Sequence, residues 1–246
     1  MRPRLVHLVG GLDGCALAVE RVAGALIIDA LRASATAAML CAAGAREIRC
    51  VGSVDAALAQ RERWPDALLY GERGAVPPPG FDYGNSPHAA RHAAGRRVVF
   101  TTTNGTACLL AAKGAAQILM ASTVNAAAAA AASASAEVVV IPAGKVHTPG
   151  QVCAEDWAAA AHVARLLGGV SGEGKRDYGN WCREIDRIGL ADIFAQSAHA
   201  EALRRTGQGE DVAFCAQCDI TGAVPHCAAT TLDSATLVLD RPQGDR

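Results

Sequence analysis

The sequence is poor in aromatic side chains and has no excess of basic charge. Aromatic residues make up 4% of the 246 residues, and the formal net charge at pH 7 is −1. A general nucleic-acid binder normally shows a basic excess, and single-stranded nucleic acid is usually held on stacked aromatic rings. We therefore expect no nucleic-acid partner.

The chain also lacks a long apolar run. Arg2 and Arg4 precede an apolar stretch, but Asp13 and Glu20 interrupt it before the core of a signal peptide could form. No window of about 20 apolar residues is free of charge, so we expect no membrane partner. The alanine-rich run 126–136 is only weakly hydrophobic and favours a surface helix.

The cysteines show no sign of a disulfide framework. There are nine of them, an odd number, and they are scattered along the chain. Without a signal peptide, this pattern favours reduced thiols that are buried as small apolar side chains. We expect a cytoplasmic protein.

Apolar residues are abundant, at 51% of the chain, which is enough for a sizeable core. Strand-like runs alternate with helix-like runs over the first two thirds of the sequence. This alternation is typical of βαβ units with parallel strands. We predict a three-layer α/β fold, with a mostly parallel sheet and helices on both faces. Strands are expected at 25–28, 46–52, 95–100, 115–121 and 136–142.

The chain divides into three parts. Segment 1–167 carries most of the motifs. A glycine-rich and polar stretch at 168–180 predicts a loop or linker, and segment 181–246 is expected to pack on the same body. Within it, the run 192–207 predicts an amphipathic helix, and 230–240 predicts a terminal strand on a sheet edge.

The run VVFTTTNGT at 98–106 is the most informative stretch. Its first residues are β-branched and aromatic, which suits a buried strand, and a helix-like run ending at Gly114 follows. Between them lie hydroxyls, an amide and free N–H groups, where an open α/β sheet binds ligands and a helix start attracts anions. One helix cap needs a single hydroxyl, so we interpret this stretch as an anion-binding turn. Its members are Thr101, Thr102, Thr103, Asn104, Gly105 and Thr106.

Other predicted strand ends carry similar chemistry. Because the carboxyl ends of parallel strands lie on one edge of a sheet, we expect these side chains to converge. They are Asp29, Arg32 and Ser34 after the first strand, Glu72 and Arg73 after a short strand, Asp82, Asn85 and Ser86 on a proline- and glycine-rich loop, and Glu155 and Asp156 at a helix start.

These strings resemble one known family. IIDALRASAT, GERG, PGFDYGNSP, TTTNGT, IPAGK and AEDW occur in the order typical of the 2-phosphosulfolactate phosphatase family, the ComB-like proteins. GFDYGNSP together with TTTNGT is highly specific. Ala30, Ala35 and Tyr83 depart from the family strings. The matches span Ile27 to about Trp157, with a weaker echo near the C-terminus.

The resemblance implies an α/β phosphatase that uses Mg²⁺ and acts on a small phosphorylated acid. In some organisms this reaction belongs to coenzyme M synthesis. Mg²⁺ prefers a few carboxylates with waters and substrate oxygens, and the candidates are Asp29, Asp82, Glu72, Glu155 and Asp156. We expect the catalytic set to be Asp29, Arg32, Arg73 and Asn104, and the substrate-binding set to be Ser34, Asn85, Ser86, Thr101, Thr102, Thr103, Gly105 and Thr106.

Several alternatives stay open at this stage. The two arginines could grip phosphate or sulfonate, or form ordinary ion pairs. Glu155 and Asp156 could simply complement a helix dipole. Hydrolysis could be direct, or it could pass through a covalent intermediate on Asp29.

Other functions also compete. The substrate could be a different phospho-acid, or the protein could bind a phospho-metabolite without turnover. The run 169–176 is close to a nucleotide-binding loop but follows a helix, and Cys215, Cys218, His226 and Cys227 could hold zinc. A homodimer is a further option.

Overall fold

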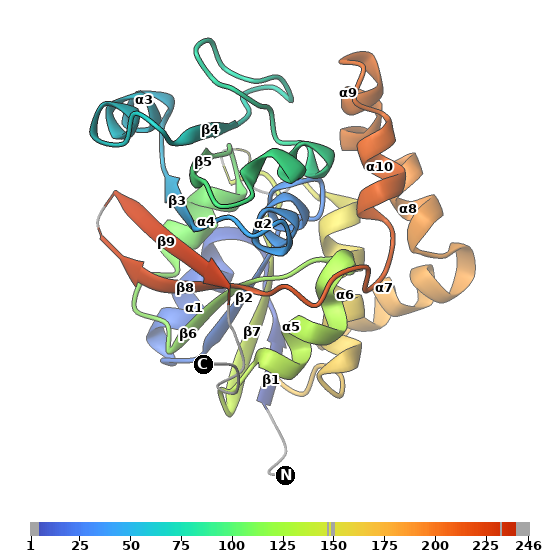
Figure 1. Cartoon of the computed structure of the whole chain (residues 1–246). Coiled ribbons are helices and arrows are strands. Elements are labelled where there is room, and N and C mark those ends of the chain that lie inside the picture. The colour runs from blue at the N-terminus through green and yellow to red at the C-terminus, as the bar shows by residue number, and fades with distance from the viewer. Residues whose placement is uncertain (1–4, 147, 149–150, 232, 240–246) are drawn as a thin grey trace.

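The computed structural model describes residues 5–146, 148, 151–231 and 233–239. This part of the chain contains nine strands in one sheet (Figure 1). Their bounds are β1 Leu5–Leu8, β2 Gly24–Ile28, β3 Glu47–Val51, β4 Leu68–Gly71, β5 Arg97–Thr101, β6 Gln117–Met120, β7 Glu137–Pro142, β8 Pro225–Thr230 and β9 Ser234–Leu239. The strand order is β1-β7-β2-β6-β8-β9-β3-β5-β4.

Helices fill the intervals between the strands, as the alternation in the sequence predicts. The bounds are α1 Gly11–Glu20, α2 Ala33–Ala42, α3 Val54–Arg63, η1 Pro87–Ala93, α4 Gly105–Ala111, η2 Thr123–Asn125, α5 Ala126–Ala132, α6 Ala154–Leu166, α7 Lys175–Ile188, α8 Leu190–Gln196, α9 Ala198–Arg205 and α10 Glu210–Cys215, where η marks a 3₁₀ helix. None of the helices in the described ranges is long and apolar enough to cross a membrane.

The core lies on both faces of the sheet. Ala25 and Ile27 of β2 pack in one apolar cluster with residues of α1 and α4, while Leu26 and Ile28 pack in a second cluster with residues of α5 and α6. Successive side chains of a strand point to opposite faces, so the sheet is covered on both sides. The expected three-layer α/β fold is therefore confirmed.

The sheet is mixed at its centre, because β8 and β9 run antiparallel to their neighbours. The terminal strand was expected on a sheet edge, and this prediction is wrong, since β9 lies between β8 and β3. Ala235 and Leu237 of β9 are fully buried, as a central strand requires. Strand order depends on long-range pairing, which the local pattern does not contain.

The glycine-rich stretch packs against β1. The N–H groups of Ser171 and Gly172 donate to the Val6 carbonyl. A Cβ on Gly174 would lie 2.0 Å from the Leu8 carbonyl oxygen, so glycine permits this close approach. Helix α7 begins directly afterwards, at Lys175, and the loop expected at 168–180 therefore ends earlier than predicted. This contact with β1 explains why the stretch is rich in glycine, so its composition does not require a nucleotide-binding loop.

The chain beyond α7 covers the side of α6 and then returns to the sheet (Figure 1). The helix expected at 192–207 is two helices, because Ser197 ends α8 and caps α9 by accepting the Ala200 N–H at 3.0 Å. Helices α8, α9 and α10 contact one another, and α10 also contacts η1. The C-terminal segment thus reaches the loops that follow β4.

The turns after β2 and β5 touch, although β6, β8, β9 and β3 lie between these two strands in the sheet. A Cβ on Gly105, at the start of α4, would lie 2.7 Å from the Ala33 Cβ at the start of α2. The ends of β2 and β5 therefore come together through the turns and helix starts that follow them. Residues of both turns line the cavity described next.

Candidate active site

A cavity of about 310 Å³ lies where the turns after β2, β4, β5 and β7 meet helix α9. Most of its charged and polar lining comes from stretches that the sequence analysis singled out. The lining residues are Asp29, Leu31, Arg32, Glu72, Gly74, Ala75, Asn85, Thr103, Asn104, Lys145, Thr148, Ala198, His199 and Ala202.

Asp29 is the buried carboxylate at the centre of the site. Its Oδ1 accepts the Ala33 N–H at 3.1 Å, and the Gly105 N–H also acts on the carboxylate. The side chain therefore lies at the start of both α2 and α4. Burial nevertheless raises the pKa of Asp29 above its ordinary value, because water is excluded from its charged form.

Arg32 is buried and largely committed to partners inside the protein. Its Nη1 donates to Asp211 Oδ2 and to Gln208 Oε1, each at 2.5 Å, and its Nη2 donates to the Ala75 carbonyl at 3.1 Å. A guanidinium has further N–H groups in its fork, and Arg32 lines the cavity. Arg32 is therefore positioned to hold an anion, with its own charge already balanced by Asp211.

Glu72 organises the TTTNGT turn from the end of β4. Its Oε1 accepts both the N–H and the hydroxyl of Thr103, at 2.8 and 2.9 Å. Its Oε2 accepts the Ala75 N–H at 3.1 Å. Glu72 and Thr103 both line the cavity, so the structure brings these two predicted residues together.

The remaining threonines of the turn bond to the protein itself. Thr102 Oγ1 accepts the Thr106 N–H at 3.2 Å, and Thr106 Oγ1 donates to the Thr102 carbonyl at 2.6 Å. Thr101 Oγ1 accepts from Arg73 at 3.0 Å. The polar residues of the TTTNGT turn therefore reflect internal bonding as well as a cavity wall, since only Thr103 and Asn104 of this turn line the cavity.

Two further predicted substrate ligands shape the turns. The Ser34 hydroxyl accepts the Asp29 N–H and donates to the Ile27 carbonyl, both at 3.0 Å. Gly105 leaves room for the carboxylate, because a Cβ there would lie 2.8 Å from Asp29 Oδ2. Neither residue lines the cavity. Both hold the β2 turn in place.

Asn85 and Ser86 of the proline- and glycine-rich loop have different roles. Asn85 lines the cavity and is 3% exposed, and its Oδ1 has no hydrogen-bond partner among the described residues. An unsatisfied buried amide is costly, so it is a natural contact for a ligand. The Ser86 hydroxyl instead donates to Asp211 Oδ1 at 2.7 Å and so acts behind Arg32.

The structure does not bring Asp82 or Arg73 to the cavity. Asp82 Oδ2 accepts the Leu69 N–H at 2.7 Å and pairs with Arg61. Arg73 donates to the Glu72 carbonyl at 2.6 Å and to Thr101. Both side chains brace the loop after β4, which explains why they follow a strand end without facing the ligand space.

Glu155 and Asp156, in the first turn of α6, lie behind the cavity wall. Asp156 accepts the Ala30 N–H at 2.8 Å and the Gly144 N–H at 3.0 Å, and thereby joins the ends of β2 and β7. Burial raises the pKa of Asp156 well above its ordinary value, and the charge of Asp29 adds to this effect.

Glu155 supports a histidine that the sequence analysis did not select. Glu155 is buried, and its Oε1 lies 3.2 Å from His199 Nδ1. Burial on its own would lower the pKa of His199. The hydrogen bond and the charge of Glu155 outweigh it, with help from the charges of Asp29 and Glu72, and raise the pKa. His199 thus pairs a raised pKa with a place in the cavity wall.

Three other participants also went unselected, namely Lys145, Gln208 and Asp211. Lys145 belongs to IPAGK, whose strand-end position could have indicated it. His199 lies in α9, Gln208 between α9 and α10, and Asp211 in α10. No motif marks His199 or Gln208, and Asp211 lies in the weaker family echo near the C-terminus, which indicated no role for it. Only the tertiary contact of α9 and α10 with the loops after β2 and β4 brings them to the site.

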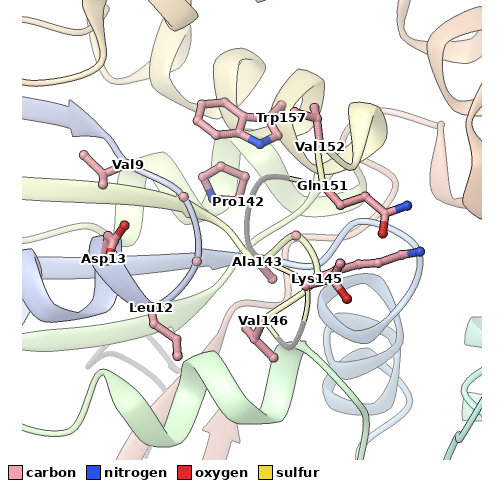
Figure 2. A pocket seen from close by; sticks show the side chains of 14 residues that line it. Val9, Leu12, Asp13, Pro142, Ala143, Lys145, Val146, Gln151, Val152 and Trp157 are labelled. Atoms are coloured by element: carbon pink, nitrogen blue, oxygen red, sulfur yellow. The ribbon is translucent and has the colours of Figure 1, made fainter.

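A second cavity of about 440 Å³ adjoins the first (Figure 2). Apolar side chains such as Leu12, Pro142 and Trp157 form much of its wall, and Lys145 and Thr148 line both cavities. Figure 2 shows Lys145 extending beside Gln151, away from Val9 and Asp13.

The cavity of about 310 Å³, called the inner cavity from here on, is lined by oxygen donors that fit a hard cation such as Mg²⁺. Asp29 and Glu72 provide carboxylate oxygens, and Asn85 provides the unpartnered amide oxygen. The described ranges contain no cluster of three or more His, Cys, Asp or Glu side chains arranged as ligands. Mg²⁺ commonly takes only one or two carboxylates and fills its shell with water and substrate oxygens.

The cysteines show no shared site. Cys215 is buried in the apolar cluster beneath α10, whereas Cys218 is exposed, and both carry free thiols. These cysteines belong to no cluster of three or more metal-ligating side chains in the described ranges, so nothing there supports zinc at the C-terminal cysteines.

The fold and site define an α/β protein with a cavity at the carboxyl ends of parallel strands that is lined by carboxylates, a guanidinium and an imidazole. Residues 16–230 match the family described as 2-phosphosulpholactate phosphatase. The chain belongs to this family, and it is an enzyme of the phosphoric monoester hydrolase class.

Curated relatives agree over most of their length. A protein of Deinococcus radiodurans is 41% identical over 210 residues, which cover 82% of this chain and 86% of the relative. One of Thermus thermophilus is 38% identical, covering 81% and 86%, and one of Carboxydothermus hydrogenoformans is 34% identical, covering 82% and 84%. Each is named "Probable 2-phosphosulfolactate phosphatase". The expected family is thus confirmed.

Proposed function

We propose that this enzyme hydrolyses 2-phosphosulfolactate to 3-sulfolactate and phosphate, with Mg²⁺ as its cofactor. The observation that carries the proposal is the inner cavity, in which Asp29, Arg32 and the unpartnered Asn85 amide meet. The names of the relatives supply the substrate.

Hydrolysis of a phosphate ester needs charge neutralisation, an activated water and a protonated leaving group. Arg32 supports the first requirement through guanidinium N–H groups that its internal partners leave free. Asn85 and Thr103 add polar contacts to the wall of the same cavity. These contacts would orient the phosphate before reaction.

Asp29 is the group we assign to water activation. Its raised pKa makes the carboxylate a better proton acceptor than an exposed aspartate. In the proposed step, a water oxygen forms a bond to phosphorus, Asp29 takes a proton from that water, and the bond between phosphorus and the ester oxygen breaks.

His199 is the group we assign to the leaving oxygen. Its pKa is raised by Glu155, so it holds a proton more firmly than an ordinary histidine. It would give this proton to the ester oxygen as the alcohol leaves. A base and an acid whose environments differ in this way are a recurring arrangement in hydrolases.

Mg²⁺ would be held by Glu72 with Asn85, and it would supply charge neutralisation at the phosphate oxygens. The buried carboxylates support this proposal, because burial and the charge of Glu72 raise the pKa of Asp29, and burial and the charge of Asp29 raise the pKa of Asp156. Surplus acids would repel a phosphate unless a cation lay between them.

The test is phosphate release from a panel of phospho-acids, with Mg²⁺ and with excess chelator. We expect release from 2-phosphosulfolactate, its loss with chelator and its return with added Mg²⁺. Full activity in chelator would remove Mg²⁺ from the proposal. Release from another phospho-acid alone would change the substrate, and binding without release from any ester would favour a metabolite-binding protein.

Three expectations from the sequence accompany the proposal as predictions. In an organism that makes coenzyme M, the reaction would belong to that synthesis. The cytoplasmic location and the option of a homodimer are the other two.

A further inference from the structure

Lys145 stands at the junction of the two cavities and lines both of them (Figure 2). Its side chain is exposed to solvent. Within the described ranges, no carboxylate forms an ion pair with it, in contrast to the other cations near the site. A ligand that enters the inner cavity would therefore meet an ammonium group whose charge is unbalanced.

The other cationic side chains are already engaged. Arg32 pairs with Asp211 at 2.5 Å. His199 contacts Glu155 at 3.2 Å, and Arg73 does not line the cavity. Among the cationic side chains that line the inner cavity, Lys145 is therefore the one whose charge is not paired within the described ranges, and it can bind an additional anionic group of the substrate.

The backbone of Lys145 is held on both sides by residues of the site. The Gly144 N–H donates to Asp156 Oδ2 at 3.0 Å, and the Val146 N–H donates to Asn104 Oδ1 at 3.3 Å. The Lys145 carbonyl accepts the Thr148 N–H at 2.9 Å. A flexible side chain on a fixed backbone can select a ligand by position as well as by charge.

We propose that Lys145 binds the second acid group, a carboxylate or a sulfonate, of a small phospho-acid whose phosphate lies in the inner cavity. This inference rests on the proposed function for the identity of the phosphate ester. It also replaces the sequence-based expectation that an arginine from another strand end holds that group.

The chemistry of the two ends of the ligand matches the two kinds of cation. A guanidinium fork suits the planar, bidentate contacts of a phosphate, while an ammonium is a compact point charge that accepts an anion from several directions. A contact that is equally strong in the ground state and the transition state changes KM and leaves kcat unchanged, and a charge contact away from the reacting phosphate is expected to be of this kind. Lys145 is thus a specificity-determining residue, expected to act mainly on KM.

The experiment uses Lys145→Met, which keeps the length of the side chain and removes its charge, and Lys145→Arg, which restores a charge. Lys113→Met is the matched control, because Lys113 is an exposed lysine outside both cavities. Two readouts are compared in buffer with Mg²⁺. One is the ratio of kcat/KM for 2-phosphosulfolactate to that for ethyl phosphate, and the other is the Kd of 3-sulfolactate by calorimetry, which needs no turnover.

We expect Lys145→Met to lower the kcat/KM ratio by about tenfold or more, chiefly through KM, and to raise the Kd of 3-sulfolactate by a similar factor. Lys145→Arg should recover most of both, and Lys113→Met should match the wild type. Equal values for Lys145→Met and Lys113→Met would overturn the inference, and so would a wild type that does not bind 3-sulfolactate. If the wild type releases no phosphate but binds 3-sulfolactate through Lys145, the proposed function fails and the acid-binding site stands.

Discussion

Arg32 Nη1 lies 2.5 Å from Asp211 Oδ2, and both side chains are buried. The two residues are far apart in the chain, one in the turn after β2 and the other in α10. Ser86 bonds to the second carboxylate oxygen of Asp211 at 2.7 Å. The C-terminal helices therefore hold Arg32, the arginine that we propose binds phosphate, in place, and the GNSP loop supports them.

Removal of the acid from this pair should destabilise the fold. Asp211→Asn leaves a buried guanidinium without a counter-charge, which typically costs about 3–5 kcal/mol of unfolding free energy. It should also lower kcat/KM, because Arg32 loses its fixed position. Urea unfolding and a phosphate-release assay measure the two effects. Glu210→Gln is the control. Glu210 is next to Asp211 in the sequence, but its own carboxylate is exposed and forms no ion pair in the described structure. Equal stability of the two variants would contradict a structural role for Asp211.

Gly105→Ala should disturb Asp29, the proposed base, from the side of α4. The added Cβ would lie 2.7 Å from the Ala33 Cβ and 2.8 Å from Asp29 Oδ2, so Asp29 or α4 must shift. Overpacking of this kind costs about 1–3 kcal/mol, and we expect kcat to fall by more than the loss of folded protein explains. Gly222→Ala is the control, because a Cβ there meets no atom within 4 Å. A Gly105→Ala enzyme with wild-type kcat would show that the position of Asp29 does not matter for turnover.

His199 should set the alkaline limb of the pH profile. Its pKa is raised above the ordinary 6.5, because the effects of Glu155, Asp29 and Glu72 outweigh burial. If protonated His199 is the acid, activity is present below this raised pKa and is lost as the pH rises through it. In Glu155→Gln the supporting charge is gone, so the limb should move to lower pH. His199→Gln should remove the limb and lower kcat by about 10²–10⁴-fold.

The measurement is kcat/KM between about pH 5 and about pH 9, the range in which histidines titrate. Glu201→Gln serves as the control, because Glu201 lies in the first turn of the same helix, outside the cavity. An alkaline limb that stays at the same pH in Glu155→Gln would exclude His199 as the group that titrates.

The sequence predicted the strand ends of the site and missed its C-terminal wall. Asp29, Glu72 and Asn104 follow strands, where local pattern indicates both the strand and the exposed turn. Asp82 follows the same pattern but pairs with Arg61, because position along a strand does not determine which way a loop folds. His199 lies on a short helix with no motif, Asp211 lies in the weak echo near the C-terminus, and only tertiary packing brings them to the site.

The TTTNGT turn shows the same limit in a single motif. Its hydroxyls and amide suggested one anion-binding surface, but Thr102 and Thr106 bond to each other. The side-chain oxygen of Asn104 accepts a hydrogen bond from the Val146 N–H at 3.3 Å. The motif is thus partly a support for the turn after β7, and through Asn104 it also fixes the backbone that carries Lys145.

This relationship predicts that Asn104 and Lys145 act as one unit. Asn104→Ala frees the Val146 N–H and loosens the backbone that carries Lys145, so it should raise KM for 2-phosphosulfolactate. In the Lys145→Met enzyme, Asn104→Ala should raise KM by a smaller factor, because the charge that the backbone positions is already gone. A double-mutant cycle on kcat/KM should therefore show a coupling of about 0.5–3 kcal/mol, the range for residues that share an interaction. Asn180→Ala, on the exposed face of α7, should combine additively with Lys145→Met in the same assay. Additive effects of Asn104→Ala and Lys145→Met would mean that Asn104 acts on the substrate independently of Lys145. The hydrogen bond between Asn104 and the Val146 N–H would then not affect kcat/KM through Lys145.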